Sequence, residues 1–542
     1  MFIPFNIVDI LLLFISCGFS EILDYDQTSL VVKLNEGSVR GKLITTWRGK
    51  NVRAFLGMPY AKPPIGNLRF KDPEDVESWD GIRSALEDGS LCTQTKGGNI
   101  IGEEDCLFIN VFVPKTAKTN LPVLFYIHGG FLAFGSSNSK DLGPEILLDY
   151  CDCILVTMNY RLSVLGFLSI DDAEARGNFG FKDQVAALKW VNRNIQHFGG
   201  DCNQVTLFGH SAGSTSVGYH LHSEMSRGLF HRAILASSAM DSHRATSAKF
   251  AKDNTLKLAD HLNCPTSDDA SVIMKCLREK SVKDIYDNLK HFRVFGNEPL
   301  LVFRPTLEND CGETCFITEH SVKSRSSVPL LVGYTSEDGY IVSETIMKKP
   351  EIIAAINKKF DDIIPVVLRY DQFEDKTQMT KAIKKYYLEN SDIHPGNFMK
   401  FTHMCGDVMY WRAMLKELID HDGPAMVYYY THRGTLTYLR NKNLEGVAHG
   451  DHQLLIFPYQ SQFGEHRISE KDSQVSEEFA SLVAGFVELG ESFPGWNNFD
   501  LCSMNYLHIG TNVYQMKRRI IGDRSTFWLD WLLGDNHEHT EL

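Results

Sequence analysis

The stretch Val205-Thr-Leu-Phe-Gly-His-Ser-Ala-Gly213 contains the feature on which the fold prediction rests. Its apolar run stops directly at Gly209, and Ser211 then stands between two glycines in the pattern G-x-S-x-G. A tight turn from a strand into a helix exposes such a serine hydroxyl, and the glycines allow neighbouring backbone to approach closely. The pentapeptide alone also fits an ordinary Gly/Ser turn. The surrounding sequence therefore has to distinguish such a turn from a strand-to-helix turn that exposes the serine.

Similar short apolar runs recur along the chain, and each ends at a turn or a polar cluster. They are continuously apolar rather than alternating, which is typical of strands covered on both faces of a mostly parallel sheet. Between two of them, Val185, Leu188, Val191 and Ile195 recur at helical spacing. The pattern predicts an α/β fold with a large, mostly parallel central sheet flanked by helices. The runs are 122–128, 153–158, 205–208, 232–236, 329–334 and 425–430.

The composition is that of an ordinary globular protein, since 43% of the 542 residues are hydrophobic and 23% are charged. It excludes a disordered chain, a collagen-like chain and a disulfide-dense miniprotein. The chain carries 55 basic and 68 acidic side chains, which gives a formal net charge of −13, and no basic cluster is present. The charge therefore argues against nucleic acid or anionic lipid as the main partner.

No repeat, low-complexity tract or linker divides the chain. Two polar, helix-like stretches, about 244–295 and 345–420, interrupt the series of apolar runs. We interpret them as helical excursions over the sheet and the site, and we predict one domain over residues 21–538.

Residues 1–20 are predicted to be a secretory signal peptide. The apolar core is too short to span a bilayer, and small residues stand near position 20. Because no basic residue precedes Lys33 and Asp9 interrupts the core, an apolar strand or a membrane anchor stays open as the alternative. No later segment is long and apolar enough to be transmembrane.

The last four residues, His539-Thr-Glu-Leu542, resemble the His-Asp-Glu-Leu retention address with Thr in place of Asp. Behind a signal peptide, this tail favours the lumen of the endoplasmic reticulum and a retention receptor as a partner. The alternative is a polar end on a secreted protein.

Several ordered motifs together resemble the carboxylesterase/cholinesterase family, also called the type-B esterases. The extended pattern Phe198-Gly-Gly-x₄-Val205-x-Leu-x-Gly-x-Ser-Ala-Gly213 is similar to the serine signature of that family. The likeness covers roughly residues 28–535 and is closest to insect esterases of the beta-esterase kind. It implies the α/β-hydrolase fold and hydrolysis of small-molecule carboxylic esters with no metal and no cofactor. The other matching segments are 57–64, 104–114, 159–162, 177–184 and 446–451.

The resemblance also implies a catalytic triad, which in this fold follows the chain order Ser, acid, His. Ser211 is the expected nucleophile, and His449, within Val447–Asp451, is the expected base. The family's acid stands immediately before a glycine, which indicates Asp338; the adjacent Glu337 is the alternative. In these roles His449 accepts the serine proton, and Asp338 orients its ring and stabilises the imidazolium.

The oxyanion hole is expected to use the backbone N–H groups of Gly130, Phe131 and Ala212. Ala212 follows the nucleophile, whereas the other two belong to His128-Gly-Gly-Phe131. The family usually has a small residue where this chain has Phe131. We therefore expect the ring to crowd the acyl pocket and to favour small acyl groups.

The chain has 12 cysteines, and removal of Cys17 with the signal would leave an odd number, hence at least one free or intermolecular thiol. Cysteine and histidine spacings give no structural zinc motif. Two close pairs could close short loops in an oxidising compartment. The resemblance implies that these pairs, Cys92/Cys106 and Cys264/Cys276, are the family's first two disulfides.

Two classes of function remain. The first is a serine esterase for xenobiotic, pheromone, hormone or dietary esters. Within it, juvenile-hormone esterases typically have Gln before the nucleophile, where this chain has His210. The second is a catalytically inactive binding or adhesion module of the same family. The presence of Ser211, Asp338 and His449 favours the enzyme.

Overall fold

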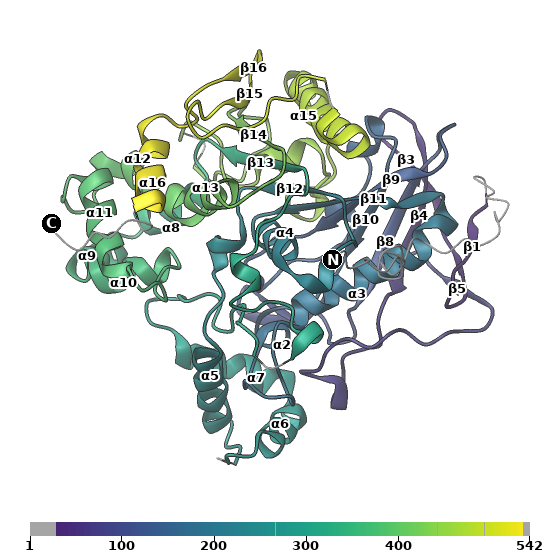
Figure 1. Ribbon diagram of the computed structural model, residues 1–542, viewed down its shortest axis with the longest axis horizontal. Helices are drawn as coiled ribbons and strands as arrows, with labels where there is room; N and C mark the ends of the chain where they lie inside the picture. The colour runs from purple at the N-terminus through teal and green to yellow at the C-terminus, as the bar shows by residue number, and fades with distance from the viewer. Residues whose placement is uncertain (1–28, 266, 310, 442, 493, 535–542) are drawn as a thin grey trace, which may run out of the picture.

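The computed structural model describes residues 29–534 except 266, 310, 442 and 493 (Figure 1). The predicted signal peptide and the predicted retention tail lie outside these residues. Over the described part of the chain, none of the helices has the length and apolar character that a membrane crossing needs.

A twisted sheet of eleven strands forms the centre of the described structure, in the order β16-β15-β14-β13-β12-β11-β9-β10-β8-β4-β3. The pairings from β10 through to β15 are parallel, and the strands at both edges are antiparallel. The strands are β3 (Lys42–Thr45), β4 (Asn51–Pro59), β8 (Phe108–Pro114), β9 (Leu121–Ile127), β10 (Ile154–Met158), β11 (Gly200–His210), β12 (Arg232–Ala236), β13 (Leu330–Thr335), β14 (Ala425–Tyr430), β15 (Tyr506–Gly510) and β16 (Val513–Lys517).

Each of the six apolar runs in the sequence forms one of the central strands, β9 to β14. Every residue of β13 is buried, and its side chains alternate between two cores. Leu330 and Val332 belong to the core on one face, whereas Leu331 belongs to the core on the other. This two-sided burial explains why the runs are continuously apolar, and the predicted α/β architecture is confirmed.

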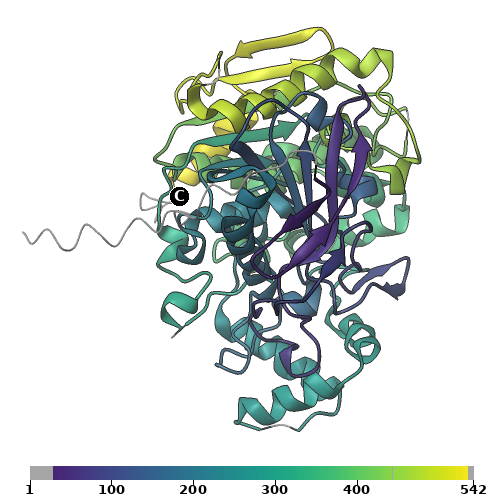
Figure 2. The same cartoon turned by 90° about the vertical axis from the view of Figure 1, so that its right-hand side faces the viewer.

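Helices cover both faces of the sheet. On one face lie α3 (Phe179–Asn194) and α4 (Ala212–His222), and on the other lies α15 (Glu470–Leu489) (Figures 1 and 2). The periodic residues Val185, Leu188 and Val191 form the buried stripe of α3, as their spacing predicts.

The two polar stretches are helical and are inserted between consecutive strands. The first, with α5 (Ala248–His261), α6 (Ala270–Glu279) and α7 (Val282–Asn288), leads from β12 to β13. The second leads from β13 to β14 and forms the group at the left of Figure 1. It comprises α8 (Tyr340–Met347), α9 (Pro350–Lys358), α10 (Phe360–Val367), α11 (Lys376–Leu388), α12 (Phe398–Gly406), a π-helical turn (Asp407–Trp411) and α13 (Arg412–Ile419).

Smaller elements complete the fold. Two small sheets, β1-β2-β5 and β6-β7, lie outside the central sheet. The strands of these two sheets are β1 (Val31–Lys33), β2 (Ser38–Arg40), β5 (Ile82–Ser84), β6 (Gln94–Lys96) and β7 (Asn99–Ile101). The remaining α-helices are α1 (Ser139–Leu142), α2 (Ser163–Phe167), α14 (Gln460–Phe463) and α16 (Asp523–Gly534).

Four disulfides connect described cysteines. Two are the expected bonds, Cys92–Cys106 and Cys264–Cys276. The other two join cysteines that the sequence analysis left unpaired, Cys151–Cys153 and Cys311–Cys315. Within the described residues, Cys405 and Cys502 carry free thiols.

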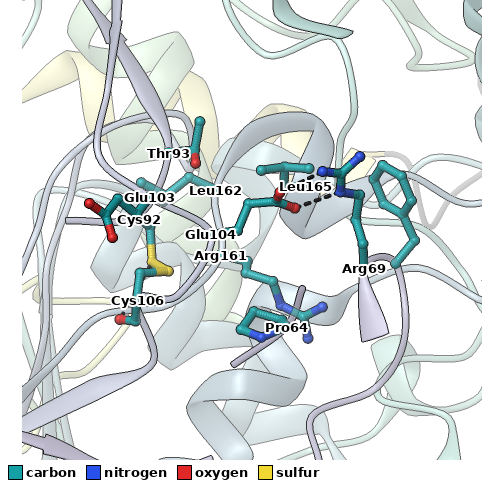
Figure 3. A pocket seen from close by; sticks show the side chains of 11 residues that line it. Pro64, Arg69, Cys92, Thr93, Glu103, Glu104, Cys106, Arg161, Leu162 and Leu165 are labelled. Carbon is teal, nitrogen blue, oxygen red and sulfur yellow. Dashed lines mark hydrogen bonds and ion pairs between the residues drawn. A yellow bond between two sulfur atoms is a disulfide. The ribbon is translucent and has the colours of Figure 1, made fainter. Parts of the chain in front are cut away.

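A pocket of about 260 Å³ lies beside the Cys92–Cys106 bond (Figure 3). On its other side Glu104 accepts two hydrogen bonds from Arg69, at 2.5 and 2.6 Å. Arg69 also donates to the carbonyl groups of Arg278 and Lys280, which ties this loop to the end of α6. All of these interactions connect segments of the fold, and we assign the pocket a structural role.

Candidate active site

Ser211 stands at the sharp turn between β11 and α4. Its backbone has φ +56° and ψ −126°, a conformation that L-residues rarely adopt, and the residue is 5% exposed. The turn is tight enough to require glycine on both sides. A Cβ on Gly209 would lie 2.2 Å from the carbonyl carbon of Gly213, and one on Gly213 would lie 2.0 Å from the carbonyl oxygen of Ile127.

His449 and Asp338 meet behind this turn. The Nδ1 of His449 lies 2.8 Å from Oδ1 of Asp338, and both residues are buried. The second carboxylate oxygen of Asp338 accepts a hydrogen bond from the N–H of Thr335, at 3.1 Å. The structure thus holds the carboxylate at two points, and it fixes which edge of the imidazole faces it.

The remaining ring nitrogen of His449, Nε2, is buried and makes no hydrogen bond within the described protein. The ring centroid lies 4.7 Å from that of His210, the residue before Ser211. His449 therefore packs next to the turn at Ser211, and its Nε2 has no hydrogen-bond partner within the described protein.

The carboxylate of Glu337, the alternative acid, contacts other groups than the imidazole of His449. Its carboxylate accepts a hydrogen bond from the N–H of Val447 at 2.7 Å and another from the hydroxyl of Ser336. Burial raises the pKa of the Glu337 carboxyl. Glu337 thus connects the end of β13 to the loop that carries His449, whereas the imidazole itself contacts Asp338.

The loop after β9 brings Gly130 and Phe131 to the nucleophile turn. Gly129 packs against it so closely that an added Cβ would lie 3.1 Å from the Cβ of Ser211. Within the described residues, the N–H groups of Gly130, Phe131 and Ala212 donate no hydrogen bond to the protein. Ala212 also begins α4, where the helix dipole favours negative charge.

The ring of Phe131 has neighbours that the sequence analysis did not single out. Its centroid lies 4.1 Å from the guanidinium carbon of Arg369 and 5.7 Å from the ring centroid of Phe134. His243 lies 6.4 Å away, edge to face. Arg369 and His243 come from the inserted segments, where no motif marks them.

Two further buried histidines surround His449. Burial lowers the pKa of His452 to about 3, and it lowers that of His210 well below the ordinary value, with smaller contributions from the charges of His449 and His452. Both rings are therefore neutral near pH 7. An imidazolium that forms on His449 meets no positive charge from them.

Over the part of the chain that the structure describes, no three His, Cys, Asp or Glu side chains are arranged to hold a metal ion. The chemistry available at this site is that of a serine hydroxyl, an imidazole, a carboxylate and backbone N–H groups. Such a set is suited to acyl transfer.

The doubly wound sheet and the turn at Ser211 define an α/β-hydrolase fold. The model of the carboxylesterase family matches residues 28–528, and the chain belongs to this family. The solved structure of the juvenile hormone esterase from Manduca sexta, with OTFP covalently attached, superposes with a TM-score of 0.82 at 27% identity. The superposition covers 94% of this chain and 99% of that one.

Curated relatives agree with this assignment. The juvenile hormone esterase of Tribolium castaneum is 32% identical over 97% of this chain and 98% of its own length. A carboxylic ester hydrolase of Bombus ignitus is 33% identical over 94% and 96%. Esterase FE4 of Myzus persicae is 36% identical over 74% and 72%. The family and these relatives support hydrolysis of carboxylic esters.

Proposed function

We propose that this protein is a serine carboxylesterase, a carboxylic-ester hydrolase in which Ser211 is the nucleophile, His449 the general base and Asp338 the residue that orients the base. The observation that supports this proposal most is the 2.8 Å contact between His449 and Asp338. The ring of His449 also lies 4.7 Å from that of His210, which precedes the serine held in a strained turn. The proposal needs no metal and no cofactor.

The mechanism follows from the donors and acceptors present. Nε2 of His449 takes the proton of Ser211 as Oγ attacks the ester carbonyl, which forms a tetrahedral oxyanion. His449 then gives the proton to the departing alcohol oxygen, and an acyl-enzyme remains. Water attacks the acyl-enzyme with His449 again as base, and the carboxylic acid leaves. Base catalysis of this kind contributes ~10²–10⁴-fold.

The oxyanion is stabilised by the N–H groups of Gly130, Phe131 and Ala212. Each is a backbone donor that is otherwise unused within the described protein. Loss of a single donor of this type costs roughly 3 kcal/mol of transition-state stabilisation. The carboxylate of Asp338 stabilises the imidazolium on His449.

The proposed substrates are small or medium carboxylic esters. The ring of Phe131 narrows the space beside the oxyanion donors and favours short acyl chains. Detoxification, pheromone, dietary and hormone esters are the classes we consider. Hormone esters gain support from the two relatives named as juvenile hormone esterases, whereas His210 before the nucleophile argues for a broader esterase.

We further propose a location in the secretory pathway. The basis is the signal-like sequence of residues 1–20, followed by one domain over residues 21–538. The tail His539–Leu542 would retain the protein in the endoplasmic reticulum through a retention receptor; otherwise the protein is secreted.

Hydrolysis of p-nitrophenyl acetate by the purified protein tests the enzymatic proposal. We expect turnover by the wild type, and a loss of at least about 10⁴-fold in Ser211→Ala. Ser473→Ala, at an exposed serine on α15, is the matched control and should keep wild-type activity. Absence of turnover by the folded wild type would contradict the proposal and favour a binding module.

A further inference from the structure

Arg369 packs against Phe131, a residue of the candidate active site. It follows the end of α10, has φ +66° and is half-buried. Its Nη1 lies 3.0 Å from Nε2 of His243, and its guanidinium carbon lies 4.1 Å from the ring centroid of Phe131. The guanidinium is thus held between the inserted helices and a residue of the proposed oxyanion hole.

Among the described residues, no carboxylate lies within ion-pair distance of Arg369. Its guanidinium contacts the ring nitrogen of His243 and the hydroxyl of Tyr410, and Glu298 attracts its charge from further away. Two neighbouring arginines differ in this respect: Arg304 pairs with Asp371 at 2.8 Å, and Arg244 lies 3.6 Å from Asp241. Burial lowers the pKa of the Arg369 guanidinium.

A small pocket opens at this guanidinium. Its charged lining consists of Arg244, Arg304 and Arg369 against the single carboxylate of Glu298. The other wall is mostly apolar and comes from residues 299–301. Asp371 and Asp241 pair with two of these arginines, and Arg369 is the guanidinium of this lining without an ion-pair partner. A partly dehydrated guanidinium of this kind favours an anionic occupant.

Two residues, Phe131 and Tyr410, lie between the Arg369 guanidinium and the proposed catalytic groups. Phe131 carries one of the proposed oxyanion donors on its backbone and the ring under Arg369 on its side chain. Tyr410 stacks on His449, and the charge of Arg369 opposes the rise that burial causes in the pKa of the Tyr410 hydroxyl. An anion bound to Arg369 would therefore lie near the ring of Phe131.

We propose that Arg369 binds a carboxylate on the acyl part of the ester, so that the preferred substrates are monoesters of dicarboxylic acids. This inference rests on the proposed esterase function and names its substrate class. The planar fork of guanidinium N–H groups would donate to the two carboxylate oxygens. The reaction is ordinary hydrolysis: the monoester and water give the dicarboxylate, the alcohol and one proton.

The test compares monoethyl glutarate with ethyl pentanoate, which has the same number of acyl carbons and a methyl group in place of the carboxylate. Ethanol release gives kcat/KM for each ester. We expect the wild type to favour the anionic ester by at least about tenfold. In Arg369→Gln the ratio of the two kcat/KM values should fall about 10- to 100-fold, mainly through KM for monoethyl glutarate.

Two further variants separate binding of the carboxylate from damage to the fold. Arg369→Lys keeps the charge without the planar fork and should give an intermediate ratio. Arg467→Gln, at an exposed arginine, is the control and should reproduce the wild-type ratio. A wild type that prefers ethyl pentanoate, or an Arg369→Gln variant with an unchanged ratio, overturns the inference while the esterase function stands.

A measurement of binding affinity tests the role of Arg369 even if no ester is hydrolysed. Titration calorimetry of Ser211→Ala with monoethyl glutarate should show binding that is weakened at least about tenfold in Ser211→Ala/Arg369→Gln. Failure of the wild type on p-nitrophenyl acetate contradicts the esterase proposal alone. Equal affinity in the two variants contradicts the role of Arg369 alone.

Discussion

The ring of Tyr410 lies flat against the ring of His449, with the centroids 4.5 Å apart and the planes 16° from parallel. Tyr410 belongs to the π-helical turn Asp407–Trp411, and the contacts of Asp407 hold this turn in place. The buried carboxylate of Asp407 accepts hydrogen bonds from Tyr334 and Tyr387 and pairs with Arg524 of α16. The inserted helices thus support one face of the proposed base's ring, while Asp338 contacts its Nδ1 edge.

Removal of this stacking should slow catalysis without abolishing it. An aromatic pair contributes about 0.5–1.5 kcal/mol, so Tyr410→Leu is expected to lower kcat by up to about tenfold. Tyr410→Phe keeps the ring and should stay within about twofold of the wild type. Stopped-time assays with p-nitrophenyl acetate measure both, and equal losses in the two variants would show that the hydroxyl, not the stacking, is responsible.

The neighbouring carboxylates of Asp338 and Glu337 have different proposed roles. Asp338 is the proposed catalytic acid, whereas Glu337 is structural. Asp338→Asn removes the charge that faces His449 and should lower kcat by about 10⁴-fold, as for acid-to-amide exchange in a Ser-His-Asp triad. Glu337→Gln keeps an oxygen for the N–H of Val447 and should cost less than about tenfold. The reverse order of the two losses would transfer the catalytic role to Glu337.

The ring of Phe131 should limit the length of the acyl chain. Phe131→Ala keeps the backbone donor and removes the ring, so turnover of p-nitrophenyl octanoate relative to acetate is expected to rise about tenfold or more. Phe134→Ala, whose ring lies 5.7 Å from that of Phe131, serves as the comparison and should change the ratio less. A wild type that hydrolyses the octanoate faster than the acetate would already contradict the crowding argument.

Acid should destabilise the fold through its buried neutral histidines. Burial lowers the pKa of His452 from 6.5 to about 3. Between those values the unfolded chain binds a proton at this residue that the folded chain does not, so stability falls as the pH falls.

The loss approaches 1.4 kcal/mol per pH unit within that window. We therefore expect His452→Leu to remove about 2 kcal/mol of the decrease in unfolding free energy between about pH 7 and about pH 5, measured by urea denaturation. The same pH dependence in the variant and the wild type would rule out His452 as a source of the acid sensitivity.

The disulfide Cys264–Cys276 should stabilise the first insertion, in which it joins residues 12 apart. Replacement of both cysteines by serine is expected to lower the unfolding free energy by about 2–4 kcal/mol, since the unfolded chain loses a constraint. Thermal unfolding monitored by circular dichroism measures the change. Cys502→Ser removes a free, exposed thiol and should leave the midpoint as it is.

The sequence allowed much of the sheet to be predicted, because a strand covered on both faces must be apolar throughout. The antiparallel edge strands escaped this reasoning. Leu43 of β3 is 56% exposed and Tyr514 of β16 is 40% exposed, so these strands lack the continuous apolar pattern. Pairing of Cys151 with Cys153 and of Cys311 with Cys315 was likewise not predicted, because spacing alone does not fix connectivity.

The candidate site was predictable only where chain order and local motif coincide. Ser211, Asp338 and His449 each follow a strand or stand in a recognisable motif, and the structure brings Asp338 and His449 into contact. Arg369 and Tyr410 lie in a polar helical segment with no such marker. Their place beside Phe131 and His449 results from tertiary packing, which local sequence patterns do not encode.

The segment from α8 to α13 leaves the sheet after β13 and returns to it at β14. Its length and composition can therefore change in evolution without a shift in the register of the strands. Substitutions in this segment can thus alter what surrounds Phe131 and His449, through Arg369 and Tyr410, while the strands keep their pairing.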